Sequence, residues 1–295
     1  MRWLALVALT GCISLDSRGV PKKNPDFLVV GHRGAPNEAA ENTLPSYAAA
    51  LRLGANAIEM DLCVTADGQV VVWHDRDPDE TVAVARQNGI EGLPWRPFVP
   101  ESGSPFRRPI DELQLADFLA SHGYSRDGSR DPLAEIPLFT DFVDWAAGQD
   151  GLEAVYLDIK VIQPAQAARI LELAAGLDIT VYAMSIHRDI VEAMIAEDAP
   201  GVRVVFEHED SGALEHSEEL GLRDLSIGLT VLRSESSVLD EIDAAVDARK
   251  KGRIDSITVW TIDEPRAMAV FLFHQVDAVL TNDPLRLHQI WQATL

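Results

Sequence analysis

The sequence predicts a parallel α/β barrel, in which short buried strands alternate with helices. Eight or nine short apolar runs follow one another along the chain, separated by segments with helical periodicity. Charged residues stand where several of these runs end, which is where a barrel enzyme places its chemistry. An open doubly wound sheet is the main competing architecture, but the sequence has no P-loop or GxGxxG pattern to support it.

The first βαβ unit is predicted over residues 27–62. Phe27–Val30 is a short apolar run that stops at the sequence GHRG. Asn42 or Thr43 can cap a helix that has Pro45 in its first turn and continues at helical spacing to residue 54. The second strand, Ala57–Leu62, is therefore expected to be a parallel neighbour of the first.

A tight turn follows the second strand. Only residues 63–69, which contain the turn sequence TADG, separate it from the next apolar run, Val70–Trp73, and this leaves no room for a crossover helix. The two runs are therefore expected to form a hairpin or a sharp corner, in which residue 59 or 60 pairs with residue 74. Either register brings His74 close to Glu59 and Asp61.

Residues 76–135 interrupt the alternation. This stretch holds seven prolines and many charges, and Ile110–Leu119 is its one amphipathic segment. Loops of such length are usually functional lids or disordered segments. We therefore predict a partly ordered insertion over one end of the barrel.

Regular alternation resumes at Ile136. The predicted strands are Ala154–Ile159, Ile179–Ala183, Val202–Phe206, Leu225–Leu229, Ser256–Trp260 and Ala278–Thr281. The predicted helices are Phe139–Ala147, Pro164–Ala175, His187–Ala196, Ser236–Lys251 and Glu264–Phe273.

Two carboxylates lie two residues apart in the second strand. Glu59 and Asp61 point to the same face, where they repel each other unless a cation or a proton lies between them. Asp158, in a later strand, can supply a third oxygen ligand, and such ligands suit Ca²⁺ or Mg²⁺. The alternative is a solvent-exposed strand face, but both acids lie inside an otherwise apolar run.

Two histidines and two bases also stand at strand ends. His32 and His74 have the placement of an acid–base couple, and Arg33 and Lys160 can bind a phosphate oxyanion together with a metal. Trp260 is either a wall for a small organic group or an ordinary core aromatic. The remaining histidines lie in loop or helical contexts and are expected to be structural or superficial: His122, His187, His208, His216, His274 and His288.

The composition limits the classes of molecule that the protein is expected to bind. There are 47 acids against 25 bases, a net charge of -22, which argues against nucleic acid or an anionic membrane surface. An anionic substrate would therefore need local positive charge, from a metal or from a few placed bases. The two cysteines provide no disulfide framework, and Cys63 is expected to be an inert packed thiol.

Residues 1–25 are predicted to be a lipoprotein signal peptide and tether. A short apolar run ends in Leu-Thr-Gly-Cys, which resembles the lipobox of bacterial lipoproteins. This resemblance implies cleavage before Cys12 and lipidation of that cysteine, hence a location in the cell envelope, anchored by lipid and facing the periplasm. The alternative is a disordered tail that happens to contain Gly-Cys. No run is long enough for a membrane-spanning helix.

The ordered motifs GHRG, ENT, EMD, HD, YLDIK, VWTID and DAVLTNDP resemble the glycerophosphodiester phosphodiesterase family over roughly residues 28–290. The resemblance implies a TIM-type (β/α)8 barrel for residues 26–295, with the insertion following the HD motif. It implies that His32 and His74 are the catalytic pair and that Arg33 and Lys160 bind phosphate.

The resemblance also implies a metal and a substrate. Glu59, Asp61 and Asp158 would hold one divalent ion, Ca²⁺ or Mg²⁺. The family more often has glutamate at the third position, so a water can intervene at the shorter Asp158. The substrates would be deacylated phospholipids such as glycerophosphocholine, hydrolysed to glycerol 3-phosphate and an alcohol.

The expected mechanism is acid–base catalysis. One histidine accepts a proton from the nucleophile and the other donates one to the leaving alcohol. The nucleophile is either the neighbouring glycerol hydroxyl, which gives a cyclic phosphate, or water. Two other functions remain open: a lysophospholipase D-like phosphodiesterase acting on acylated lipids, and a non-catalytic phosphate-binding lipoprotein. The presence of both histidines and the acid pair argues against the second.

Overall fold

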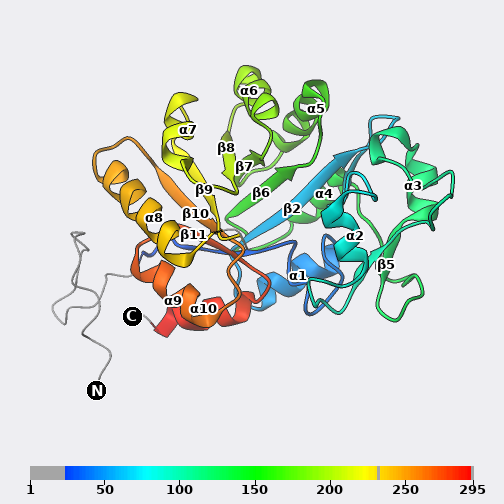
Figure 1. Cartoon of the computed structure of the whole chain (residues 1–295), viewed down its shortest axis with the longest axis horizontal. Coiled ribbons are helices and arrows are strands. Elements are labelled where there is room, and N and C mark those ends of the chain that lie inside the picture. The colour runs from blue at the N-terminus through cyan, green and yellow to red at the C-terminus, as the bar shows by residue number, and fades with distance from the viewer. Residues whose placement is uncertain (1–23, 231–232, 294–295) are drawn as a thin grey trace.

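The computed structural model describes residues 24–230 and 233–293, which form a closed parallel barrel surrounded by helices (Figure 1). Its strands pair in the order β1-β11-β10-β9-β8-β7-β6-β2, and β2 pairs in turn with β1. The strands are β1 (Leu28–Gly31), β2 (Ala57–Val64), β6 (Ala154–Ile159), β7 (Thr180–Ser185), β8 (Val202–His208), β9 (Asp224–Gly228), β10 (Ser256–Trp260) and β11 (Ala278–Thr281). Closure confirms the predicted barrel and excludes the open doubly wound sheet.

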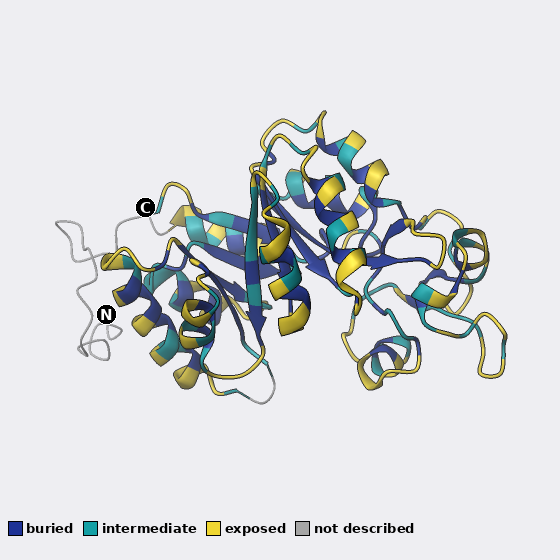
Figure 2. Cartoon of the chain, turned by 90° about the horizontal axis from the view of Figure 1, so that it is seen from above, coloured by how far each residue is buried: buried dark blue, intermediate teal, exposed yellow. Residues whose placement is uncertain are grey.

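Helices cover the outside of the barrel and turn their buried faces to the strands (Figure 2). They are α1 (Leu44–Arg52), α4 (Phe139–Ala146), α5 (Pro164–Ala174), α6 (Arg188–Glu197), α7 (Ala213–Glu219), α8 (Glu235–Lys250), α9 (Pro265–Phe273) and α10 (Pro284–Ala293). The sequence prediction lacks α7 and α10. In α7 the buried residues are Ala213 and Ser217, which give no clear apolar stripe. In α10, Leu287, Ile290 and Trp291 do recur at helical spacing and pack on the core, so this helix could have been identified from the sequence. None of the described helices is long and apolar enough to cross a membrane. Cys12 and the predicted lipobox lie outside the described residues.

Side chains alternate between two cores along each barrel strand. In β2, Ile58, Met60 and Leu62 pack outward in the core that includes the helices, whereas Ala57 lies in the cluster inside the barrel. Glu59 shares the inward face with Ala57, and Asp61 continues it. The predicted common face of the two acids is therefore the barrel interior, not a solvent-exposed surface.

The second strand continues into a hairpin. β3 (Val70–Val72) pairs antiparallel with β2, with Leu62 opposite Val72 and Val64 opposite Val70. The same register places residue 60 opposite residue 74, so the expected hairpin is confirmed. Cys63 is fully buried in it and donates its thiol hydrogen to the carbonyl of Trp73 at 3.3 Å, as expected of a packed thiol.

Residues 76–135 form an ordered unit beside the barrel (Figures 1 and 2). The unit packs on the hairpin through Trp73, whose ring meets Phe118 and Tyr124 with centroids 5.8 and 5.1 Å apart. Its elements are α2 (Thr81–Gln87), β4 (Arg96–Phe98), the 3₁₀ helix η1 (Ile110–Glu112), α3 (Leu115–Ser121) and β5 (Gly123–Ser125), with β4 and β5 paired antiparallel.

The structure divides the amphipathic segment Ile110–Leu119 into two helices. Leu113 is buried and extended between them, and its carbonyl accepts a hydrogen bond from Ala66 N at 2.8 Å. Asp67 Oδ1 accepts from Leu115 N at 2.9 Å and so caps the first turn of α3. Contacts with the β2–β3 turn therefore decide where α3 begins.

His122, at the end of α3, is expected to make folding stability fall in acid. Burial lowers its pKa to about 4, and its Nε2 has no hydrogen-bond partner among the residues that the structure describes. The folded protein therefore binds fewer protons than the unfolded chain between pH 6.5 and 4, so the free energy of unfolding decreases as the pH falls through this window. The loss between pH 7 and 4.5 is about 2–3 kcal/mol from this residue.

Urea denaturation at pH 7, 5.5 and 4.5 measures this effect. His122→Phe should lose less stability on acidification than the wild type, whereas His187→Phe, at an exposed position, should behave as the wild type does. An unchanged pH dependence in His122→Phe would contradict the assignment of a neutral, buried imidazole.

Candidate active site

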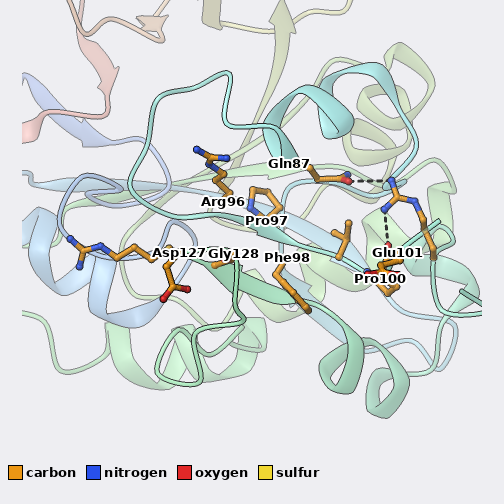
Figure 3. A pocket seen from close by; sticks show the side chains of 12 residues that line it. Gln87, Arg96, Pro97, Phe98, Pro100, Glu101, Asp127 and Gly128 are labelled. Atoms are coloured by element: carbon orange, nitrogen blue, oxygen red, sulfur yellow. Dashed lines mark hydrogen bonds between the residues drawn. The ribbon is translucent and has the colours of Figure 1, made fainter.

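A pocket of about 280 Å³ lies at the carboxyl ends of the barrel strands. Its lining includes seven of the predicted site residues: His32, Arg33, Glu59, His74, Asp158, Lys160 and Trp260. Asp61 lies beside them, 3.0 Å from Arg33 Nε and 3.5 Å from Lys160 Nζ. A larger hollow of about 580 Å³, within residues 76–135, is lined by none of these residues (Figure 3). The structure thus gathers the predicted site at one mouth of the barrel.

Three buried carboxylates form a compact group in the site. Glu59, Asp61 and Asp158 each offer an oxygen, and these oxygens lie within 4.8 Å of one another. Asp61 and Asp158 are register partners on the neighbouring strands β2 and β6, which brings their side chains together. Asp158 Oδ1 is buried and lacks a hydrogen-bond partner within residues 24–230 and 233–293. An unsatisfied acceptor beside two other buried carboxylates fits a divalent cation, so these three residues can hold one.

The protein environment shifts the pKa values of Glu59 and Asp61 in opposite directions. Burial, followed by the charge of Asp61, raises the pKa of Glu59. Burial also favours the neutral form of Asp61, but the charges of His74, Arg33 and Lys160 outweigh it and lower the pKa of Asp61. Asp61 therefore stays ionised, and a cation near Glu59 would relieve the repulsion between the two.

Both bases contact these acids. The backbone N–H of Arg33 donates to Glu59 Oε2 at 2.7 Å, and Lys160 Nζ contacts Asp158. Arg33 has a φ of 53°, in the left-handed region that non-glycine residues rarely occupy. The hydrogen bond to Glu59 helps to hold this conformation. The guanidinium of Arg33 and the ammonium of Lys160 therefore flank the carboxylate group.

Each histidine of the pair has a fixed partner on Nδ1. His32 Nδ1 lies 2.9 Å from Asn282 Oδ1, and the amide of Asn282 is oriented by its hydrogen bond to Asp263 at 2.7 Å. His74 Nδ1 lies 2.6 Å from Asp75 Oδ1. Because both partners are acceptors, the proton resides on Nδ1 of each ring, and each Nε2 is left for proton exchange.

Burial, followed by the charge of Arg33, lowers the pKa of His32 to about 3. Its imidazole is therefore neutral at neutral pH, with a lone pair on Nε2. Glu59 Oε2 is 3.9 Å from that atom. A neutral imidazole with a fixed tautomer is the state that a general base requires.

Several polar residues of the pocket were not predicted. Glu207 is buried on the inward face of β8, two residues after Val205, and burial and the charge of Asp158 raise its pKa. The period-2 pattern would have identified Glu207, but the predicted strand ended one residue earlier. His208, expected in a loop or helix, is instead the last residue of β8 and is buried, but it does not line the pocket. Asn282 follows β11 and is marked only by its place in the TNDP sequence.

A parallel barrel that carries a histidine pair, two bases and three carboxylates at one mouth defines an enzyme with an acid–base and anion-binding site. The chain belongs to the Glycerophosphoryl diester phosphodiesterase family, whose model matches residues 32–286. This confirms both the resemblance and the assignment as a phosphodiesterase.

The proteins and solved structures that resemble this chain over most of its length are also phosphodiesterases. A glycerophosphodiester phosphodiesterase of Caldanaerobacter subterraneus subsp. tengcongensis is 25% identical over 260 residues, which cover 87% of this chain and 94% of that protein. A crystal structure of a glycerophosphodiester phosphodiesterase from Parabacteroides distasonis has a TM-score of 0.65 and 19% identity, covering 91% of this chain and 98% of that one. A phosphodiesterase from Oleispira antarctica, solved with the product sn-glycerol-3-phosphate, has a TM-score of 0.65 and 18% identity, covering 88% and 95%.

Proposed function

We propose that the protein hydrolyses glycerophosphodiesters, which are deacylated phospholipids, to glycerol 3-phosphate and an alcohol. The observation that carries this proposal is the pair of histidines at one pocket, each with Nδ1 bonded to an acceptor, beside two bases and three acids. Family membership and the product found in the Oleispira relative support the same reaction.

His32 and His74 are the proposed acid–base pair. Neutral His32 accepts a proton on Nε2 from the nucleophile. His74 acts as the imidazolium, with its Nδ1–H bonded to Asp75, and donates its Nε2 proton to the leaving alcohol. The nucleophile is the neighbouring glycerol hydroxyl, as we favour by analogy, or water. Accumulation of a cyclic phosphate in early time points would identify the hydroxyl route.

Arg33 and Lys160 are proposed to bind the non-bridging phosphate oxygens, with Arg33 suited to a bidentate contact. Glu59, Asp61 and Asp158 are proposed to hold one Ca²⁺ or Mg²⁺ ion, directly or, at Asp158, through a water. When bound, that ion neutralises charge on the phosphate.

Release of glycerol 3-phosphate from glycerophosphocholine and glycerophosphoethanolamine tests the function. The full chain should release it with added Ca²⁺ or Mg²⁺, and EDTA should stop the release. No release with either metal, from protein shown to be folded, would overturn the proposal. Turnover of lysophospholipids instead would establish the acylated-lipid alternative, and binding without turnover would establish a phosphate-binding protein.

Trp260 is proposed to form a wall for the organic part of the substrate. Its ring lies against β9, where a Cβ added at Gly228 would stand 3.0 Å from the indole Cζ2. Loss of an aromatic contact of about 1 kcal/mol predicts that Trp260→Leu raises KM about fivefold, with little change in kcat. Gly228→Ala, which displaces the indole, should act in the same direction. An unchanged KM in Trp260→Leu would mean that Trp260 is only a core aromatic.

Cys12 is proposed to be lipidated after cleavage of the signal peptide, which would anchor the enzyme to the cell envelope on the periplasmic side. The support is the lipobox-like sequence Leu-Thr-Gly-Cys. Incorporation of a labelled fatty acid into the mature protein tests the anchor, and a mature chain without label would overturn it.

A further inference from the structure

Two buried arginines share their acidic partners beside the pocket. Arg86, in α2, has a side chain that is 1% exposed and contacts Glu41, Asp75 and Glu91. Arg33 contacts Glu41 at 3.0 Å and Glu91 at 3.1 Å. Glu41 and Glu91 therefore each bridge both arginines, which connects α2 of the 76–135 unit to the candidate active site.

Asp75 is the point at which this network reaches a histidine. Arg86 Nε lies 3.1 Å from Asp75 Oδ1 and donates to Oδ2 at 3.3 Å, so it spans both carboxylate oxygens. Oδ1 also pairs with His74 Nδ1 at 2.6 Å. An aspartate side chain can rotate, and a contact to both oxygens fixes the plane of its carboxylate. The orientation of His74 thus depends on a carboxylate that Arg86 immobilises.

We propose that Arg86 is a positioning residue, which acts through Asp75 to hold the imidazole of His74 in one tautomer and one orientation. The 76–135 unit then contributes to the catalytic geometry. The activity readout of this inference rests on the proposed function, whereas its spectroscopic readout does not.

Arginine is suited to this position because it meets three acids at once. Its planar guanidinium presents five N–H donors, of which Nε faces Asp75, Nη1 donates to Glu91 at 2.8 Å and Nη2 donates to Glu41. A lysine ammonium is a compact charge and cannot reach three carboxylates in different directions. Lysine at position 86 should therefore retain the charge and lose part of the orientation.

Arg107 provides a matched control in the same unit. Its side chain is 12% exposed and pairs with Asp79 at 2.7 Å. It also donates to the Pro100 carbonyl at 2.8 Å and to Gln87 Oε1 at 3.1 Å, bonds that are drawn in Figure 3. None of these partners lines the active-site pocket. Arg107→Gln removes a half-buried arginine network from the unit without touching that of His74.

The experiment compares Arg86→Gln, Arg86→Lys and Arg107→Gln with the wild type in two measurements. The first is steady-state turnover of glycerophosphocholine. The second is a long-range ¹H–¹⁵N spectrum of histidine-labelled protein, in which His74→Gln assigns the His74 ring signals. Circular dichroism and thermal unfolding report whether each variant is folded.

Arg86→Gln should lower kcat about 10–100-fold and shift the ring signals of His74. KM should stay within about threefold, because Arg33 keeps its own contacts with Glu41, Glu91 and Asp61. Arg86→Lys should fall between Arg86→Gln and the wild type, and Arg107→Gln should match the wild type in both measurements.

A folded Arg86→Gln with wild-type kcat and unmoved His74 signals would overturn the proposal. An equal loss in Arg107→Gln would overturn it too, since the effect would then be a general loosening of the unit. If Arg86→Gln does not fold, the test of the positioning role rests on Arg86→Lys. Wild-type kcat and wild-type His74 signals in that variant would contradict a positioning role. If the wild type turns over no glycerophosphodiester, the proposed function fails, and the His74 signals alone test Arg86.

Discussion

His74→Ala is expected to lower kcat for glycerophosphocholine by about 10²–10⁴-fold. The change removes the proposed proton donor to the leaving alcohol. His74 lies at the pocket surface with 16% of its side chain exposed, and Asp75 keeps Arg86 as a partner after the substitution. The fold should therefore survive, and the melting temperature should change by only a few degrees.

A substrate with a better leaving group distinguishes the roles of the two histidines. With a glycerophosphodiester whose leaving group is p-nitrophenol, departure needs no proton, so the loss in His74→Ala should shrink markedly. The loss in His32→Ala, which removes the proposed base, should persist. His274→Ala, in which the lost partner is Asp243 on α8, serves as the control and should keep full activity. Near-full activity in both His32→Ala and His74→Ala would show that the catalytic pair is assigned wrongly.

Glu59→Gln is expected to weaken Ca²⁺ and Mg²⁺ binding by about 100-fold or more, and to reduce metal-dependent turnover in parallel. Glutamine has nearly the same shape and can still accept the hydrogen bond from Arg33 N, but it removes one of three ligand charges. Isothermal titration calorimetry measures both affinities directly. Glu209→Gln, at an exposed acid on the rim of the same pocket, is the control and should bind as the wild type does.

The stability of Glu59→Gln provides a second test of the same site. Without metal, the variant should be at least as stable as the wild type, because it removes a buried charge that Asp61 repels. With metal at 100 times its Kd, the wild type should gain about 2.7 kcal/mol and the variant much less. Equal stabilisation of both proteins by metal would place the ion elsewhere.

The sequence by itself determined the barrel and most of its predicted site. Apolar runs of strand length, alternating with helical periodicity, are local properties, and they located the strands that carry Glu59, Asp61 and Asp158. The spacing of two residues placed Glu59 and Asp61 on one face, and the short TADG turn fixed the hairpin that brings His74 to them. These inferences succeed because each depends on residues close in the chain.

Only the tertiary structure decided which distant residues complete the site. Asn282 meets His32 across 250 residues because β11 closes the barrel against β1. Arg86 reaches Glu41, 45 residues away in the chain, because α2 folds back beside the barrel mouth, and Asp67 caps the first turn of α3 because the hairpin turn packs there. Such contacts are set by sheet closure and by packing between separate units, and they produce no periodic pattern in the sequence from which they could be predicted.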